Sequence, residues 1–522
     1  MRISTNQMQA VSMNAMLQQQ SKLSHTQLQL STGLRITKPS DDPVASARML
    51  ELMQTQTINQ QYQYNADAAT ARLRLEETIL ADMGNQFVRV KELALQGNNG
   101  SQSADSRGMI ASELRQIQAH LLEVANTKDT NGEYIFAGYQ GNTKPFAPAA
   151  DGSYVYSGDE GRRYLQVGPT RRVADSNPGS EVYMDILNGN GTFTTMDAAG
   201  NTGGGVIDPG SIYDMSLYDG DTYTIHMGMA TTTSVTGTEG VPVDFIGTDD
   251  SATLDYRFSI NGTLIYSSLV DTPPADTSEL ADLINAQTAT SGVRAYVNGT
   301  QLYLVNDPAA DQPIAVSEEL LGFTDQEDSV TGFFGSTLTG AESNAVIDYE
   351  ADADSYVVVD SMGNVETTGT YAEQELIQFN GIQTYFKGTP NNGDTFTISP
   401  SANQDVFTTL QNLIDALEAG GGDEQARADL SNAVNRVLTD LDQAQINTLR
   451  VRADVGARLA AIDSQRAANE EAVFQVTQTL STIQDLDYAE AISRLNVQLT
   501  ALQAAQQTYT KVQGLSLFDY IG

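Results

Sequence analysis

Three histidines, His25, His120 and His226, are the residues of this chain best suited by type to metal binding or general-base catalysis. They fall in an expected polar helix, an expected amphipathic helix and an expected strand, and none has a second histidine at metal-ligand spacing. The chain has no cysteine, which excludes disulfides, thiolate metal sites and cysteine nucleophiles. We therefore predict that each histidine is an ordinary surface or core residue.

The other chemistry-bearing clusters are equally weak. Glu350, Asp352 and Asp354 in the string EADAD could offer oxygen ligands to calcium, but their spacing fits no calcium-binding loop. The glycine runs 203–205 and 420–422 lack the strand-to-helix setting and the following Lys-Ser/Thr that a phosphate cradle requires, so they indicate turns and linkers. No serine occupies a nucleophile elbow. We predict no enzyme activity, no catalytic, cofactor-binding or metal-binding residues, and no cofactor.

Charge limits the possible partners. The formal net charge of the 522 residues is -38. Between residues 173 and 386 the only basic residues are Arg257 and Arg294, whereas the first forty residues contain no carboxylate. A field of this sign repels nucleic acid and anionic membrane surfaces, so we expect neither as a partner and interpret the acidic middle as a solubilising surface. The start MRISTNQMQAVSMNAMLQQQ has no apolar segment of a cleaved signal, and no run of about 18 apolar residues predicts a membrane span.

The clearest pattern lies near the two ends, where apolar residues recur at alternating steps of three and four. In the first half these positions are Ala66, Ala69, Leu73, Glu76, Leu80, Met83, Phe87, Val90 and Ala94. Towards the other end they are Val455, Leu459, Ile462, Arg466, Asn469, Val473, Val476, Leu480 and Ile483, followed after a one-residue slip by Tyr488, Ile492, Leu495, Leu499, Leu502, Gln506 and Tyr509. Ordinary helical core is the alternative, but the length of the repeats favours a coiled-coil-like bundle. The slip predicts one kinked helix or two abutting helices.

The first 34 residues are expected to be a glutamine-rich helix with Met16, Leu23 and Leu30 at seven-residue spacing. This segment has too few large apolar side chains to offset the entropy of ordering it alone, so it needs partners. A break follows, after which Asp42 can cap a new helix whose first residue is Pro43.

From about residue 134 to 399 the period changes to two, and short β-branched and aromatic runs alternate with Gly, Asn and Asp turns. This indicates an antiparallel β region. The segments 220–225 and 393–398 look alike, and the stretch FSINGTLIYSS, SELADLINAQT, VRAYVNGTQLYLVN between them predicts a hairpin, a helix and a second hairpin.

Two segments carry a resemblance to a known family. The segment SKLSHTQLQLSTGLRITKPSDDPVASARMLEL and the region from residue 446 to the ending GLSLFDYIG resemble the flagellin superfamily of bacterial flagella, over about 130 residues at each end. Three details favour a hook-filament junction member over the bulk filament subunit. These are Pro39 and Pro43 around Asp41-Asp42, the stretch NGEYIFAGYQGNTKPFA and the ending itself.

The resemblance implies a tubular or ring assembly in which terminal helices line an inner shell and β domains face outwards. It implies partners as well: further copies of the chain, a neighbouring hook-associated protein on the hook side, flagellin on the filament side and an export chaperone on the C-terminal helices. It also implies export by the flagellar secretion apparatus to an extracellular position on the flagellum.

We therefore predict an α+β multidomain protein whose N- and C-terminal helices pair, with β-rich outer domains inserted between them. The predicted division is 1–41 plus 477–522 for assembly, 42–179 plus 391–476 for a helical middle domain, and 180–390 for the outer domain. The residues predicted to contact other subunits are Met16, Leu23, Leu30, Leu495, Leu499, Leu502 and Tyr509. Those predicted to pack helices within one subunit are Leu73, Leu80, Phe87, Leu459, Ile462 and Val473. A bulk filament subunit and an adhesin displayed by the β insert remain the alternatives.

Overall fold

The computed structural model describes residues 5–150, 152–231, 244–246, 255–271, 274, 276–299, 301–307, 313–321, 329–334, 337–339, 343–349, 352–420 and 422–514. Two compact units divide the chain. The first comprises Met1–Arg74, Arg163–Asp175 and Gly456–Gly522, and the second comprises Leu75–Arg162 and Ser176–Val455. Each unit is therefore built from segments that lie far apart in the sequence.

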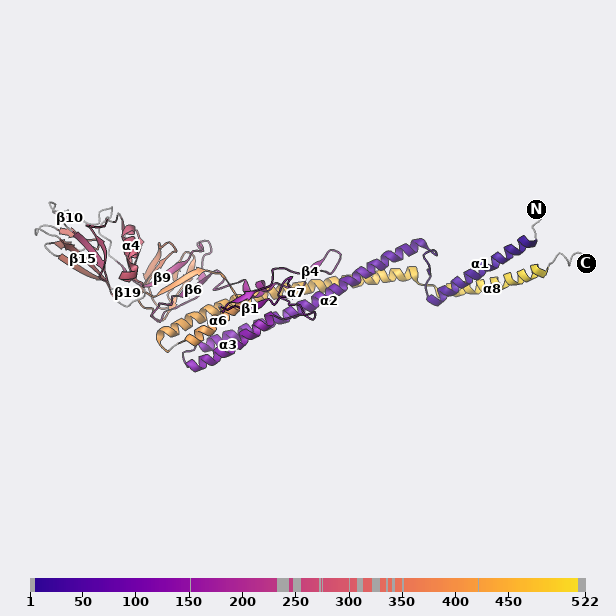
Figure 1. The fold of residues 1–522 in the computed structure, drawn as a ribbon, viewed down its shortest axis with the longest axis horizontal. Coiled ribbons are helices and arrows are strands. Elements are labelled where there is room, and N and C mark those ends of the chain that lie inside the picture. The colour runs from indigo at the N-terminus through magenta and orange to yellow at the C-terminus, as the bar shows by residue number, and fades with distance from the viewer. Residues whose placement is uncertain are drawn as a thin grey trace, which may run out of the picture. The chain divides into compact units, whose positions relative to one another are not determined.

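Long helices dominate both ends of the chain, which confirms the predicted fold class (Figure 1). The helices are α1 (Thr5–Thr32), α2 (Pro43–Gly97), α3 (Ala104–Ala125), α4 (Thr277–Ala286), α5 (Thr288–Ser291), α6 (Val406–Ala419), α7 (Glu424–Gln484) and α8 (Tyr488–Gly514), with a π-helical turn η1 (Ser180–Met184). The amide of Ala45 donates to Asp42 Oδ1 at 3.0 Å, so Asp42 caps α2 as predicted. Helices α7 and α8 are separate, which decides between the two interpretations of the one-residue slip.

Side-chain contacts show how α2 and α7 run. In the first unit Gln56 Nε2 donates to Thr477 Oγ1 at 3.3 Å, and Arg466 lies 3.4 Å from Asp67. In the second unit Arg452 pairs with Glu77 at 2.7 Å. From one pair to the next the residue number rises on α2 and falls on α7, so the two helices run antiparallel. The nine repeat positions predicted on α2 are all buried, including the carboxylate of Glu76.

The β region of the second unit is antiparallel and made of short strands. Those outside the main sheets are β1 (Phe146–Pro148), β2 (Tyr154–Tyr156), β5 (Ile186–Leu187), β7 (Val206–Ile207), β8 (Ser211–Ile212), β21 (Ile377–Phe379), β22 (Ile382–Thr384), β23 (Phe386–Lys387) and β25 (Asn403–Gln404). A hairpin of β3 (Tyr164–Gln166) and β4 (Arg172–Ala174) belongs to the first unit.

A seven-stranded sheet is the centre of the β region. It contains β6 (Phe193–Asp197), β9 (Tyr223–Thr231), β13 (Val293–Asn298), β14 (Gln301–Asn306), β19 (Asp352–Val359), β20 (Val365–Thr370) and β24 (Thr395–Pro400). Its main path is β13-β14-β9-β19-β20, and β24 pairs with both β9 and β6. The two segments that look alike in the sequence are neighbours here, because Phe396 pairs with Ile225. A parallel bridge from Val297 to Asn364 brings the two ends of the path together.

The predicted hairpin, helix and hairpin are present and contribute to one apolar core. A four-stranded sheet has the order β12 (Thr263–Ser267), β11 (Asp255–Ile260), β15 (Ile314–Leu321) and β18 (Ser343–Tyr349). A smaller sheet contains β10 (Asp244–Ile246), β16 (Ser329–Thr331) and β17 (Thr337–Thr339). Side chains of the larger sheet, α4, β13 and β14 share one apolar cluster, which includes Phe258, Ile284 and Leu304. A second cluster around Tyr223, Phe386 and Phe396 lies under β9 and β24.

The described residues contain no cluster that could hold a metal ion and no helix that could span a membrane. No group of three or more His, Asp or Glu side chains there is placed to hold a metal ion. Glu350 of the EADAD string lies outside the described residues. No described helix is both long and apolar enough to cross a membrane.

Candidate assembly site

Helices α1 and α8 lie side by side in the first unit (Figure 1). On α1 the buried or half-buried side chains recur in alternating steps of four and three, which is the pattern of a two-helix seam. The repeat runs through Ser12, Met16, Gln19, Leu23, Thr26 and Leu30, while the half-buried His25 and the buried Gln29 lie outside it and contact Asp41 and Arg35 in the loop after α1. On α8 the same pattern runs through Ala491, Leu495, Gln498, Leu502, Ala505 and Tyr509.

The connection between the two helices is held by backbone hydrogen bonds. Gly33 follows α1 with φ +73°, a left-handed conformation that favours glycine. Its carbonyl accepts from the amide of Leu486 at 2.9 Å, in the turn between α7 and α8. The amide of Arg35 donates to the carbonyl of Gln484 at 2.7 Å, and its guanidinium donates twice to the carbonyl of Ile483, at 3.0 and 2.7 Å. The end of α1 is therefore tied to the end of α7 and to the turn that leads into α8.

An acidic side chain orders the loop that leads into α2. Asp41 Oδ2 accepts from the amides of Thr37 and Lys38, at 3.1 and 2.9 Å, and lies 3.2 Å from His25 Nε2 on α1. The hydrogen bond with His25, with those from Lys38 and Thr37, holds the pKa of Asp41 well below its usual range. The carboxylate therefore stays charged and keeps the loop against α1.

The β3–β4 hairpin docks on the helices of the same unit through polar groups. Asn65 Nδ2 donates to the carbonyl of Gln166 at 2.7 Å, and Asn469 Nδ2 donates to that of Val167 at 2.8 Å. Asp175, fully buried just after the hairpin, pairs with Arg163 at 2.7 Å. Asn469 interrupts the apolar repeat of α7, and the structure shows why: its amide satisfies a backbone carbonyl that would otherwise be buried without a partner.

The structure places most of the residues predicted for subunit contacts on the seam inside the chain. Leu23 is buried, and Met16, Leu30, Leu495, Leu502 and Tyr509 are half-buried there. Leu499 differs, because 38% of it is exposed. The sequence repeat and the observed seam of α8 share positions 495, 502 and 509. Between these, the sequence repeat predicted 492, 499 and 506, whereas the seam uses 491, 498 and 505. Small or polar side chains at these positions face inwards, which leaves Ile492 and Leu499 outside.

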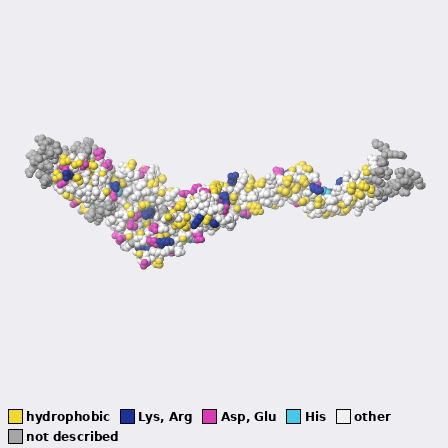
Figure 2. Space-filling model, viewed as in Figure 1, with side chains coloured by type: hydrophobic (Ala, Val, Ile, Leu, Met, Phe, Trp, Pro, Cys, Tyr) yellow, Lys and Arg dark blue, Asp and Glu magenta, His cyan; other side chains and the backbone are white. Residues whose placement is uncertain are grey.

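Among the side chains of α1 and α8 whose exposure the structure describes, six branched aliphatic ones are exposed, and the sequence repeats did not identify them as a whole. We call them the outer apolar set: Val11, Leu17, Leu28, Ile492, Val497 and Leu499. Leu17 and Leu28 are eleven residues apart, or about three turns, so they project from the same side of α1. Figure 2 shows hydrophobic side chains on the visible surface of the terminal helices. Ile492 and Leu499, seven residues apart on α8, likewise project from one side of that helix.

The residues predicted to pack within one subunit lie along α2 and α7. Leu73, Leu80 and Phe87 are fully buried on α2. On α7 Ile462 is fully buried, while Leu459 and Val473 are half-buried.

A polar stripe on α7 in the second unit was also missed by the search for apolar repeats. Asn432 accepts from the amide of Ile207 at 2.9 Å, Arg436 pairs with Asp197 at 2.8 Å, and Asp440 accepts from the amide of Gly189 at 2.6 Å. Burial raises the pKa of Asp440. Four-residue steps put these side chains on one face of the helix, and the face meets the backbone of residues 189–207. Their spacing was visible in the sequence, but their backbone partners were not.

Known proteins with similar sequences come from the bacterial flagellum. Residues 3–141 match the family described as the bacterial flagellin N-terminal helical region. Flagellar hook-associated protein 3 of Salmonella typhimurium is 35% identical over 186 residues, which cover 36% of this chain and 58% of that relative. The chain is thus similar to flagellar proteins of this family in its N-terminal quarter. The corresponding protein of Escherichia coli is 33% identical over the same shares. The chain thus matches little more than half the length of these two relatives.

Solved structures show a likeness in fold over most of the chain. The hook-associated protein 3 of Legionella pneumophila shares 24% identity with a TM-score of 0.56, and covers 83% of this chain and 98% of its own. FlgL of Xanthomonas campestris gives 24% identity and a TM-score of 0.55, over 82% and 98%. These two structures establish a common fold. A flagellin of Salmonella choleraesuis is 25% identical over 98% of this chain and 96% of its own length.

Proposed function

We propose that this chain is a structural subunit of the bacterial flagellum that joins the hook to the filament. It polymerises through α1 and α8, and it has no catalytic role. The likeness to hook-associated protein 3 supports the location and the junction role. The observation that carries the mechanism is the pairing of the two terminal helices around a narrow seam with apolar side chains left outside.

The outer apolar set supplies the contacts between copies in this proposal. Helices α1 and α8 alone cannot bury side chains on their outward sides, so a neighbouring pair of helices gives those side chains a partner. Leu499 belongs to this contact. Six seam residues keep the two helices together: Met16, Leu23, Leu30, Leu495, Leu502 and Tyr509. Neighbouring copies cover the part of the half-buried side chains that is still exposed in the single chain.

The partners follow from the same proposal. The chain contacts other copies in a ring or tube, a hook-associated protein on the hook side and flagellin on the filament side. An export chaperone covers α8 before assembly, and the flagellar secretion apparatus exports the chain without a cleaved signal. The segments 1–41 plus 477–522 form the assembly domain, 42–179 plus 391–476 the middle domain, and 180–390 the outer domain.

A deletion strain of the source bacterium tests the proposal. Cells that lack this chain should build hooks without filaments and release flagellin into the medium, and expression of the chain from a plasmid should restore attached filaments. Normal filaments in the deletion strain would rule out the junction role. Electron microscopy of the cells and protein analysis of the medium supply both readouts.

A bulk filament subunit is the second candidate, favoured by the flagellin likeness over 98% of the chain. Copy number separates the two functions. A junction subunit is a minor protein of sheared filaments, whereas a bulk subunit is the main one.

A further inference from the structure

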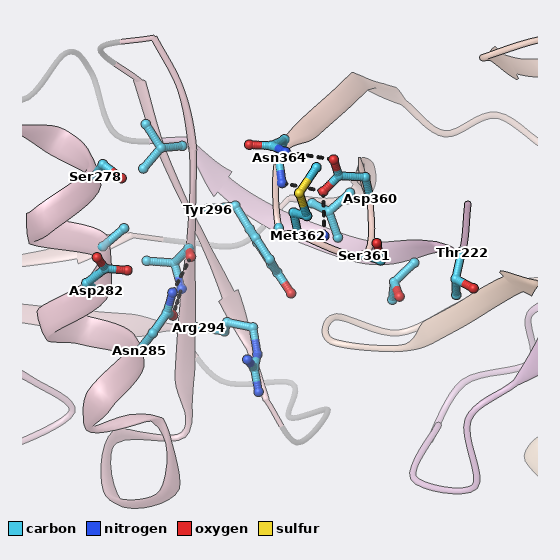
Figure 3. Close-up of a pocket in the computed structure, with 16 residues that line it drawn as sticks. Thr222, Ser278, Asp282, Asn285, Arg294, Tyr296, Asp360, Ser361, Met362 and Asn364 are labelled. Atoms are coloured by element: carbon cyan, nitrogen blue, oxygen red, sulfur yellow. Dashed lines mark hydrogen bonds between the residues drawn. The ribbon is translucent and has the colours of Figure 1, made fainter. Parts of the chain in front are cut away.

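A polar cleft of about 560 Å³ lies in the β region of the second unit. Figure 3 shows its walls: Ser278, Asp282 and Asn285 of α4 lie on one side of Tyr296, and the turn from Asp360 to Asn364 lies on the other. Thr222, just before β9, and Thr224, within it, also line the cleft. The cleft lies where the isolated parallel bridge between Val297 and Asn364 joins the two ends of the sheet path.

The floor of the cleft is held in place by hydrogen bonds. Asn285 donates to the carbonyl of Ala295 at 2.9 Å and accepts from its amide at 2.8 Å, which fixes α4 against β13. The hydroxyl of Tyr296 lies 2.7 Å from Nε2 of the buried His226, and their ring centroids are 5.0 Å apart. Tyr296 therefore presents a half-buried ring in a fixed orientation.

The opposite wall is also ordered before any ligand binds. Asp360 accepts from the amides of Met362 and Asn364, at 2.9 and 2.7 Å, and from Asn364 Nδ2 at 2.7 Å. Ser361 Oγ donates to Asp221 at 2.9 Å. A preorganised wall of this kind reduces the entropy lost on binding.

The remaining polar groups define the chemistry of the ligand. The hydroxyls of Thr222, Thr224 and Ser278 and the carboxylate of Asp282 make no hydrogen bond with another described residue. They offer donors and acceptors to a ligand. Arg294, the basic residue of the lining, is paired with Asp307 at 2.7 Å, so it does not leave the cleft positive. The acidic protein disfavours an anion, whereas a neutral ligand rich in hydroxyl groups fits these groups and can lay an apolar face on the Tyr296 ring.

We propose that this cleft binds a neutral oligosaccharide. Asp282 and the Thr224 hydroxyl hold sugar hydroxyls, and Tyr296 stacks against a sugar face. The inference is independent of the junction role, because none of these residues belongs to α1 or α8.

The test uses the full chain on an array of neutral oligosaccharides that end in glucose, galactose, mannose or N-acetylglucosamine, with sialylated and sulfated glycans beside them. Binding to one or more neutral glycans is expected, at a Kd in the range of about 1 mM or tighter. Asp282→Ala should weaken it about tenfold, the size expected for a hydrogen bond to a charged group. Thr224→Val, which keeps the side-chain shape, should weaken it less.

Glu373→Ala is the matched control, because Glu373 is exposed and is not part of the cleft lining. It should leave binding unchanged. No neutral glycan bound, binding of anionic glycans alone, or equal binding by wild type and Asp282→Ala would each overturn the proposal. Circular dichroism of each variant shows whether the fold is retained.

Discussion

Replacing His226 with glutamine should remove a specific acid sensitivity from the β region. His226 is 5% exposed on β9, and its Nδ1 has no hydrogen-bond partner among the described residues. Burial lowers its pKa from 6.5 to about 4, while Asp307 raises it and Arg294 lowers it. Tyr296 faces the ring from β13.

The sign and size follow from proton linkage. Because the folded pKa is depressed, the unfolded chain binds a proton more readily between about pH 6.5 and pH 4. The neutral form of His226 thus contributes stability that is present above pH 6.5 and lost as the pH falls through 4. A shift from 6.5 to about 4 corresponds to about 3 kcal/mol at 1.36 kcal/mol for each pH unit.

Native-state hydrogen exchange provides the assay, since a protein of several domains does not unfold in one step. The free energy of opening of the β9 and β13 amides is compared between wild type and His226→Gln at the same pH, which cancels the intrinsic exchange rate. The wild type should lose about 3 kcal/mol more than the variant between about pH 7 and pH 4. Equal pH dependence in the two proteins, or a ring pKa near 6.5 by NMR titration, would refute the reasoning.

Three further substitutions test the packing. Phe87→Ala empties a fully buried site on α2 and should lower the free energy of opening of the neighbouring α2 amides, measured by hydrogen exchange, by about 3 to 5 kcal/mol, and a loss under about 1 kcal/mol would contradict its core position. Asp394→Ala leaves the amides of Thr202 and Asn391 without their acceptor, so those amides should exchange at least about tenfold faster, whereas unchanged exchange would show that the carboxylate is dispensable. Gly33→Ala should destabilise the α1–α8 pair by about 1 to 2 kcal/mol in the exchange of α8 amides, because φ is +73° and the new methyl carbon would lie 2.9 Å from Tyr488 Oη. Tyr488→Phe in the same chain removes that contact and should recover only part of the loss, whereas full recovery would show that the backbone is not strained.

The sequence was most informative where periodicity alone decides the structure. The repeat on α2 is buried at every predicted position, and Asp42 and Pro43 start the helix where capping chemistry requires it. On α8 the same method found half of the seam. Periodicity cannot tell whether residue 498 or residue 499 lies in the seam between Leu495 and Leu502. Both spacings fit a helix, and the position of α1 decides which of the two side chains is covered.

Contacts between distant segments could not be predicted from one sequence. The carbonyl of Ile483 that accepts from Arg35 is 448 residues away. Asn432 and Asp440 look like ordinary polar positions on a helix until the backbone that they bind is in place. The cleft around Tyr296 likewise depends on strands whose order no local pattern specifies.

The outer apolar set gives the most direct test of the junction proposal. Ile492→Asp combined with Leu499→Asp changes two side chains that are 47% and 38% exposed, and circular dichroism of the monomer should show that its helix content is kept. Val270→Asp, at a site that is 83% exposed and outside α1 and α8, is the control. Electron microscopy should show hooks without attached filaments in the double variant and normal filaments in the control, with both chains exported. Normal filament attachment in the double variant would contradict assembly through these helices.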